Sequence, residues 1–130
     1  MSRIRLGIVG FAHMHIGQMV TGFQALAECF EWVGCADVPP NTPSLSMASG
    51  TRGQVLRAVV EKCGIPKVFE DYQDLLDETP DLVIVTAENA RHSALVTEIL
   101  SRGIHVILEK PMALALPGAM AMARAAQAHQ

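Results

Sequence analysis

The hydrophobic pattern of this chain switches repeatedly between short apolar runs and helical spacing. Apolar runs bounded by turn residues predict strands, and apolar residues three or four positions apart predict amphipathic helices. The predicted strands cover residues 3–9, 31–36, 67–70, 81–86 and 104–109, and the predicted helices cover 13–30, 55–63, 71–77, 89–102 and 115–128. This alternation predicts right-handed crossovers and a doubly wound parallel α/β sheet, with helices on both faces in three αβα layers.

One segment, residues 38–54, interrupts the alternation. It is rich in Pro, Gly, Ser and Thr and is far longer than the ~2–6 residues usual between elements of a compact α/β unit. We expect a mobile connection here, beginning directly after Asp37.

The composition excludes several classes of protein. The 130 residues are 50% hydrophobic and 5% aromatic, which suits one α/β domain with an aliphatic core. The net charge of −3 gives no basic footprint for nucleic acid, and no apolar run reaches the ~18 residues of a membrane span. Without a signal peptide, and with three cysteines in no CxxC spacing, we expect a cytoplasmic protein with buried, reduced thiols.

The turn after the first strand is the first candidate site. It reads Gly10, Phe11, Ala12, His13, Met14 and His15. A dinucleotide-binding turn has the pattern G-x-G-x-x-G, of which only Gly10 is kept, because Ala12 and His15 replace the second and third glycines. The context of strand, turn and helix start still favours an anion.

His13 and His15 form an H-x-H pair at the helix start. On a helix such residues do not share a face, and no Cys or carboxylate lies close in sequence, so we expect no metal site. Two alternatives remain for the pair. One imidazole contacts a phosphate or a ribose of a ligand, or the histidines are simply the first residues of the helix.

Asp37 ends the second strand, where a carboxylate can accept hydrogen bonds from the adenosine ribose of a dinucleotide. Because no Arg or Lys follows until Arg52, NAD is favoured over NADP. The alternative for Asp37 is a solvated turn residue.

Two further candidate sites follow the later strands. Thr86 and Asn89 come after the strand 81–86, and Asn89 is also of the right type for a helix N-cap. Glu109, Lys110 and Pro111 come after the strand 104–109, so Lys110 sits where open α/β sheets bind their ligands.

These features together resemble the N-terminal nucleotide-binding domain of the Gfo/Idh/MocA family of oxidoreductases. The resemblance rests on the first strand and turn, on Thr86, Asn89 and His92, and on Glu109-Lys110-Pro111. It implies a Rossmann domain and hydride transfer between NAD(P) and a hydroxyl carbon of a sugar, cyclitol or polyol. It also implies that the residues of the first turn, Asp37, Thr86, Asn89 and Glu109 bind the cofactor and that Lys110 is catalytic.

The resemblance covers residues 1–130 as one domain, and nothing in them corresponds to the family's second, substrate-binding domain. We therefore expect an excised domain, a natural truncation or a proteolytic remnant, with little turnover of its own. A stand-alone nucleotide-binding or regulatory module, or a scaffold subunit, is the alternative. The apolar helix 115–128 predicts a homo-oligomer with Met120 or Met122 at the contact.

Overall fold

The computed structural model describes residues 2–39 and 49–129 of the chain. In these residues the strands are β1 (Ile4–Val9), β2 (Phe30–Ala36), β3 (Val68–Phe69), β4 (Leu82–Val85) and β5 (His105–Leu108). The helices are α1 (Ile16–Gln24), α2 (Ser49–Cys63), α3 (Tyr72–Asp77), α4 (His92–Ser101) and α5 (Leu116–Ala128), with a 3-10 turn η1 (Asn89–Arg91) before α4. The predicted alternation of strands and helices is confirmed.

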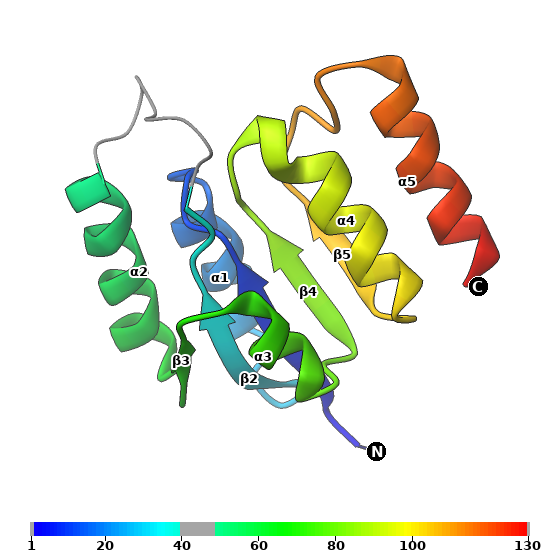
Figure 1. The fold of residues 1–130 in the computed structure, drawn as a ribbon. Coiled ribbons are helices and arrows are strands. Elements are labelled where there is room, and N and C mark those ends of the chain that lie inside the picture. Colours follow the sequence, from blue (N-terminus) through cyan, green and yellow to red (C-terminus); the bar gives the residue numbers. More distant parts are fainter. Residues whose placement is uncertain (1, 40–48, 130) are drawn as a thin grey trace.

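All the strands of the sheet are parallel, in the order β3-β2-β1-β4-β5 (Figure 1). The chain moves outward from β1 to β2 and β3, and then returns to the other side of β1 to add β4 and β5. This reversal makes the carboxyl end of β1, next to β4, the topological switch point where open α/β sheets bind their ligands.

Helices cover both faces of the sheet, as predicted for a three-layer fold. Figure 1 shows α3 and α4 in front of the sheet and α1 behind it. On one face Ile16 and Val20 of α1 and Val59 of α2 pack on Ile8 and Ile84. The other face is covered by apolar side chains of α3, α4 and α5, which pack on the alternate strand residues Val9, Ala36, Val83 and Val85.

Three of the helices differ by several residues from the sequence-based predictions. Helix α1 begins at Ile16 and ends at Gln24, and only turns follow, up to residue 29. Helix α2 begins at Ser49, so the last part of the predicted mobile connection is helical, while residues 40–48 lie outside the described part. The predicted helix 89–102 is divided into η1 and α4.

The three thiols are free, but they are not all buried. Cys35 is buried, Cys63 is half-buried and Cys29 is exposed, so the prediction was wrong for Cys29. Burial, and then the negative charge of Asp37, raise the pKa of the Cys35 thiol to about 12. In the described part of the chain, no helix has the length and apolarity that a bilayer crossing requires.

Candidate functional site

The central strands end level with one another, which creates a row of residues along the carboxyl edge of the sheet. Val9 pairs in register with Ala36 of β2 and Val85 of β4, and Val85 pairs with Leu108 of β5. The residues that follow these four form the row: Gly10, Asp37, Thr86 and Glu109. Four positions predicted from separate parts of the sequence therefore lie side by side at the switch point.

Gly10 is a position of the first turn where any side chain would be strained. Its φ of +87° is in the left-handed region, and a Cβ there would lie 2.5 Å from backbone atoms of Ala87. The turn is held from the same side, because the Thr86 hydroxyl donates to the Gly10 carbonyl at 2.6 Å and the Ala12 N–H donates to the Thr86 carbonyl at 2.9 Å. The turn and the end of β4 thus form one packed unit.

Phe11 and Thr86 shape this unit with side chains that are fully buried. The Phe11 ring belongs to the core beneath α1, and its backbone N–H donates to Asp37 Oδ1 at 3.1 Å. Because the hydroxyl of Thr86 already bonds to Gly10, both residues support the turn and neither presents a side chain to a ligand.

The backbone groups suited to an anion come later in the turn, at His13, Met14 and His15, immediately before α1. Within the described residues, no backbone carbonyl accepts from these three N–H groups. N–H groups at a helix start attract phosphate, and the exposed Met14 side chain leaves their surroundings open. The turn thus keeps an anion-binding end although its second and third glycines are replaced.

His13 joins this turn to the loop after β4. Its Nε2 lies 3.0 Å from Asn89 Oδ1, so a protonated Nε2 donates to the amide oxygen. The alternative considered for Asn89, a helix N-cap, does not hold, because Asn89 is the first residue of η1 and Glu88 takes the cap position. Its side chain instead fixes an imidazole at the carboxyl edge.

His15 reaches in a different direction, to the end of β5. Its Nδ1 lies 3.1 Å from Glu109 Oε1, which also accepts the backbone N–H of Lys110 at 3.1 Å. Burial on its own raises the pKa of Glu109, but the hydrogen bonds from His15 and Lys110 and the charges of His15 and His13 outweigh it, so the net pKa is lowered. The two histidines of the H-x-H pair therefore contact different side chains, Asn89 for His13 and Glu109 for His15.

His92 lies beneath this cluster and is fully buried. Its Nε2 lies 2.9 Å from the Ala87 carbonyl oxygen and its Nδ1 lies 2.9 Å from the Pro111 carbonyl oxygen. The imidazole therefore connects the loop after β4 to the loop after β5, a structural role that matches its predicted place in the first turn of a helix.

Lys110 is exposed, directly after the buried Glu109. Its peptide bond to Pro111 is cis, and β5 ends before it, at Leu108. A cavity of about 390 Å³ lies beside it, between α4, α5 and the end of β5, with mainly apolar walls that include Leu108, Met112 and Met122. Lys110 thus adds a polar group to the lining of a mainly apolar recess, a combination common in ligand pockets.

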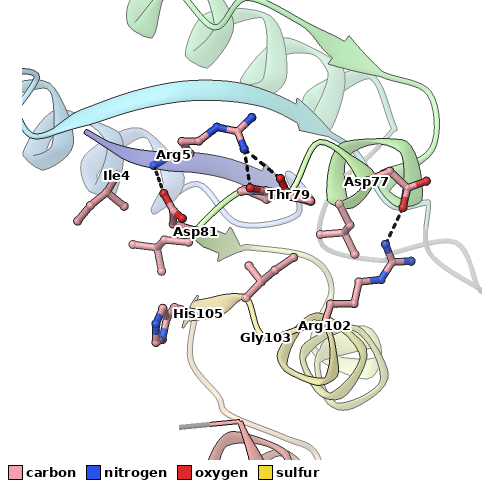
Figure 2. Close-up of a pocket in the computed structure, with 12 residues that line it drawn as sticks. Ile4, Arg5, Asp77, Thr79, Asp81, Arg102, Gly103 and His105 are labelled. Atoms are coloured by element: carbon pink, nitrogen blue, oxygen red, sulfur yellow. Dashed lines mark hydrogen bonds and ion pairs between the residues drawn. The ribbon is translucent and has the colours of Figure 1, made fainter. Parts of the chain in front are cut away.

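A second hollow, of about 960 Å³, lies at the opposite edge of the sheet, at the amino ends of β1, β4 and β5. Figure 2 shows Arg5 and Asp81 on one side of it and Arg102 on the other. Arg5 donates to the carbonyl and hydroxyl of Thr79, and Arg102 pairs with Asp77. None of the predicted site residues lines this hollow.

Comparison with protein families identifies the family of this chain. A family model described as "Oxidoreductase family, NAD-binding Rossmann fold" matches residues 4–130. This chain is a member of the Gfo/Idh/MocA family. Its parallel sheet is thus that of the family's NAD-binding Rossmann domain.

Two curated relatives have sequences similar to parts of the chain. D-xylose 1-dehydrogenase (NADP(+)) 2 from Haloferax volcanii is 38% identical over 56 residues, which are 42% of this chain and 17% of the relative. Myo-inositol 2-dehydrogenase from Thermotoga maritima is 36% identical over 69 residues, which are 52% of this chain and 21% of the relative. The matched parts are therefore about one fifth of each relative's length.

Solved structures agree on the fold. The WlbA dehydrogenase from Chromobacterium violaceum, solved in complex with NADH and UDP-GlcNAcA, has a TM-score of 0.77 and 25% identity, over 98% of this chain and 33% of its own. The WlbA dehydrogenase from Bordetella pertussis has a TM-score of 0.76 at 22% identity, over 98% of this chain and 35% of its own. This member of the Gfo/Idh/MocA family thus corresponds to about one third of those chains.

One charged residue, Arg52, was not predicted to contact the site. Arg52 of α2 donates from Nε and Nη2 to Asp37 Oδ2, at 3.0 and 2.5 Å, and is buried with 7% of its surface exposed. Arg52 lies fifteen positions after Asp37 in the sequence, so no contact between them was predicted. Only one feature of the sequence pointed to this contact, a single basic residue in the segment 38–54, which was predicted to be a loop.

Proposed function

We propose that residues 1–130 form the nucleotide-binding domain of a nicotinamide-dependent dehydrogenase. Its reaction is hydride transfer to or from a hydroxyl carbon of a sugar, cyclitol or polyol. The observation that carries the proposal is the row of Gly10, Asp37, Thr86 and Glu109 at the switch point of a Gfo/Idh/MocA domain.

The residues present fit a dinucleotide. The N–H groups of His13, Met14 and His15 suit the pyrophosphate, and the absence of a side chain at Gly10 keeps the first turn tight against β4. Asp37 faces the position expected for the adenosine ribose and supports NAD(H) as a cofactor. We assign contacts with the rest of the cofactor to Asn89 and Glu109, which lie at the same edge of the sheet. When bound, the cofactor supplies or accepts the hydride.

Lys110 is the residue we assign to catalysis. Exposed beside the apolar recess, its charged form orients a substrate hydroxyl by donating a hydrogen bond from Nζ to the hydroxyl oxygen. In its neutral amine form it accepts the hydroxyl proton at Nζ. Its backbone is fixed by the hydrogen bond of its N–H to Glu109, which His15 in turn holds. His15 follows β1 and Glu109 follows β5, and β4 lies between these two strands in the sheet. Residues from both strand ends thereby position Lys110.

The names of the relatives support the substrate class, since xylose and inositol are polyhydroxylated. Because the chain spans a small part of these relatives, we propose that groups outside residues 1–130 supply most substrate contacts. We also propose a cytoplasmic location, where its free thiols stay reduced.

We further propose that the chain self-associates. Four large apolar side chains are exposed on the loop after β5 and on α5, namely Met112, Leu114, Leu116 and Met120. A second copy of the chain that covers this group forms a symmetric dimer, the commonest closed assembly. Met122 was one of two predicted contact residues, and that alternative is wrong, because its side chain is 2% exposed and belongs to the core.

The test of cofactor binding is a titration of the chain with NADH, followed by amide resonances in NMR spectra. We expect the resonances of His13, Met14 and His15 to move, and those of Arg5 and His105 at the opposite edge to stay. ADP, which lacks the nicotinamide half, should move the same turn. Shifts centred on Arg5 and His105, or no shifts at all, would contradict the proposal.

A further inference from the structure

The ion pair between Asp37 and Arg52 changes the electrostatics expected at the adenosine end of the site. An isolated carboxylate at the end of β2 repels the 2′-phosphate of NADP(H). Here the guanidinium of Arg52 contacts the carboxylate directly, and the pair has no net charge. The buried position of Arg52 strengthens the pairing, because water screens it little.

The carboxylate of Asp37 has two different sides. Oδ1 accepts the backbone N–H groups of Phe11 at 3.1 Å and Val38 at 2.9 Å, so the backbone holds this oxygen in place. Oδ2 accepts hydrogen bonds from Nε and Nη2 of Arg52. A carboxylate offers about four lone-pair positions, and these four donors use them. A ribose hydroxyl therefore reaches Asp37 only by replacing an N–H of Arg52.

Arg52 can change partner without leaving Asp37 unsatisfied. If the guanidinium turns away, Oδ1 keeps its two backbone donors and Oδ2 becomes available to ribose hydroxyls. The released guanidinium has a planar set of donors that matches a phosphate group, and it keeps its charge at every physiological pH. The same pair thus contains an acceptor for a ribose and a donor for a phosphate.

We propose that Arg52 is a residue that determines cofactor selectivity, and that it lets this site accept NADP(H) as well as NAD(H). This inference rests on the proposed function. With NAD(H), a ribose hydroxyl replaces one N–H of Arg52 on Oδ2, and the other N–H stays bonded to the carboxylate. With NADP(H), Arg52 turns to the 2′-phosphate and neutralises it beside Asp37. The sequence-based preference for NAD assumed that no base was near Asp37, and the contact with Arg52 removes that assumption.

The competing interpretation is that Arg52 only anchors the start of α2 to the end of β2. Both interpretations predict some loss of stability when Arg52 is removed. They differ in the ratio of the two affinities, because an anchor affects NADH and NADPH alike, whereas a phosphate-binding residue affects NADPH alone.

The experiment compares dissociation constants of NADH and NADPH, and of ADP and adenosine 2′,5′-bisphosphate, for three versions of the 130-residue chain. These are the wild type, Arg52→Gln, and the control Arg57→Gln, which changes an exposed arginine on the same helix. We expect wild-type affinities for NADH and NADPH within about tenfold of each other. Arg52→Gln should weaken NADPH and the bisphosphate by at least about tenfold and NADH by less than about threefold, and Arg57→Gln should change neither.

An unchanged ratio of NADPH to NADH affinity in Arg52→Gln would overturn the inference, as would a wild type that prefers NADH by more than about a hundredfold. Binding of neither cofactor to the wild type would overturn the proposed function itself. If Arg52→Gln does not fold, Arg52→Lys replaces it, because it keeps the charge but not the planar donors. It should then weaken NADPH by a smaller factor.

Discussion

His15 and Glu109 connect the first turn of the chain to the end of β5, with Nδ1 and Oε1 3.1 Å apart. Glu109 is buried and His15 is half-exposed, so the pair lies at the boundary between core and solvent. His15 stands where the G-x-G-x-x-G motif has its third glycine, and Glu109 directly precedes Lys110. The replacement of a glycine by histidine thus adds a tertiary contact to the site.

The first prediction concerns the pH dependence of this pair. The pKa of Glu109 in the folded chain is below its ordinary value of 4.5, so the pair stabilises the fold above that pH and stops doing so as the pH falls through the lowered value. His15→Ala should therefore lower the free energy of unfolding by about 0.5–1 kcal/mol at pH 6, since solvent weakens the half-exposed contact. The deficit should shrink toward pH 3.5.

Urea unfolding at several pH values measures this effect. Met14→Ala is the matched control, because the neighbouring Met14 side chain is 73% exposed. A deficit in His15→Ala that is the same at pH 6 and pH 3.5 would show that the ion pair is not its cause.

The second prediction concerns the backbone at Gly10. Gly10→Ala should reduce the free energy of unfolding by about 2–4 kcal/mol, because the new methyl collides with the Ala87 backbone and φ is positive. Gly17→Ala is the control, since a Cβ there meets nothing within 4 Å and alanine favours the helix. Thermal unfolding of both variants gives the comparison. Similar stabilities for the two would mean that the turn relaxes easily away from β4.

The strands and their order along the chain were predictable, but several boundaries of the helices were not. Strand β4 is a continuous apolar run, and β1 becomes apolar and buried after Arg5, so both were recognisable from the pattern of apolar residues. Helix α1 ends at Gln24 although apolar residues continue, because Leu26 and Ala27 are exposed and gain nothing by packing. Helix α2 begins within a Ser- and Gly-rich segment that local propensity reads as a loop.

The positions of the candidate site were found from the sequence, but their partners were not. Motif and strand position identified Gly10, Asp37 and Lys110. The contacts His13–Asn89 and Asp37–Arg52 join residues 76 and 15 positions apart, and neither separation leaves a periodic signal. Such contacts depend on how strands and helices are placed in space, which a single sequence does not report.

The third prediction is that the 130-residue chain shows no substantial dehydrogenase turnover. Hydride transfer needs both reactants held in reacting geometry, and we assign most substrate contacts to groups outside this chain. A screen of sugars, cyclitols and polyols, followed by the absorbance of the reduced cofactor, tests this. Clear turnover that disappears in Lys110→Ala would show that the chain holds a substrate by itself.

The fourth prediction concerns the thiols. With the pKa of Cys35 at about 12, roughly one molecule in ten thousand carries its thiolate at pH 8, and only the thiolate reacts with alkylating agents. Iodoacetamide should modify the exposed Cys29 first and leave Cys35 unmodified in the folded chain. Asp37→Asn should accelerate Cys35 by less than about tenfold, because burial is the larger cause of the shift. Mass spectrometry of digested samples locates the label, and early labelling of Cys35 would contradict the prediction.

The fifth prediction concerns self-association through the exposed apolar group. Leu116→Glu and Met120→Glu should shift a dimer toward monomer in sedimentation experiments, because each places a charge in the contact. Gln127→Glu adds the same charge to an exposed polar position of α5 and serves as the control. A wild type that remains monomeric at high concentration would exclude the dimer. A dimer that persists in both variants would place the contact elsewhere.

The packing of the first turn against the end of β4 has a consequence for how this domain opens. The Ala12 N–H is bonded to the Thr86 carbonyl and the Thr86 N–H to the Val9 carbonyl, while the Thr86 hydroxyl holds Gly10. Neither segment can separate from the other without breaking all three bonds. The amide protons of Ala12 and Thr86 should therefore exchange with deuterium at a common slow rate, as one cooperative unit. The first turn, in which Ala12 and His15 replace two motif glycines, is therefore held rigid by its bonds to Thr86 at the end of β4 and not by its own sequence.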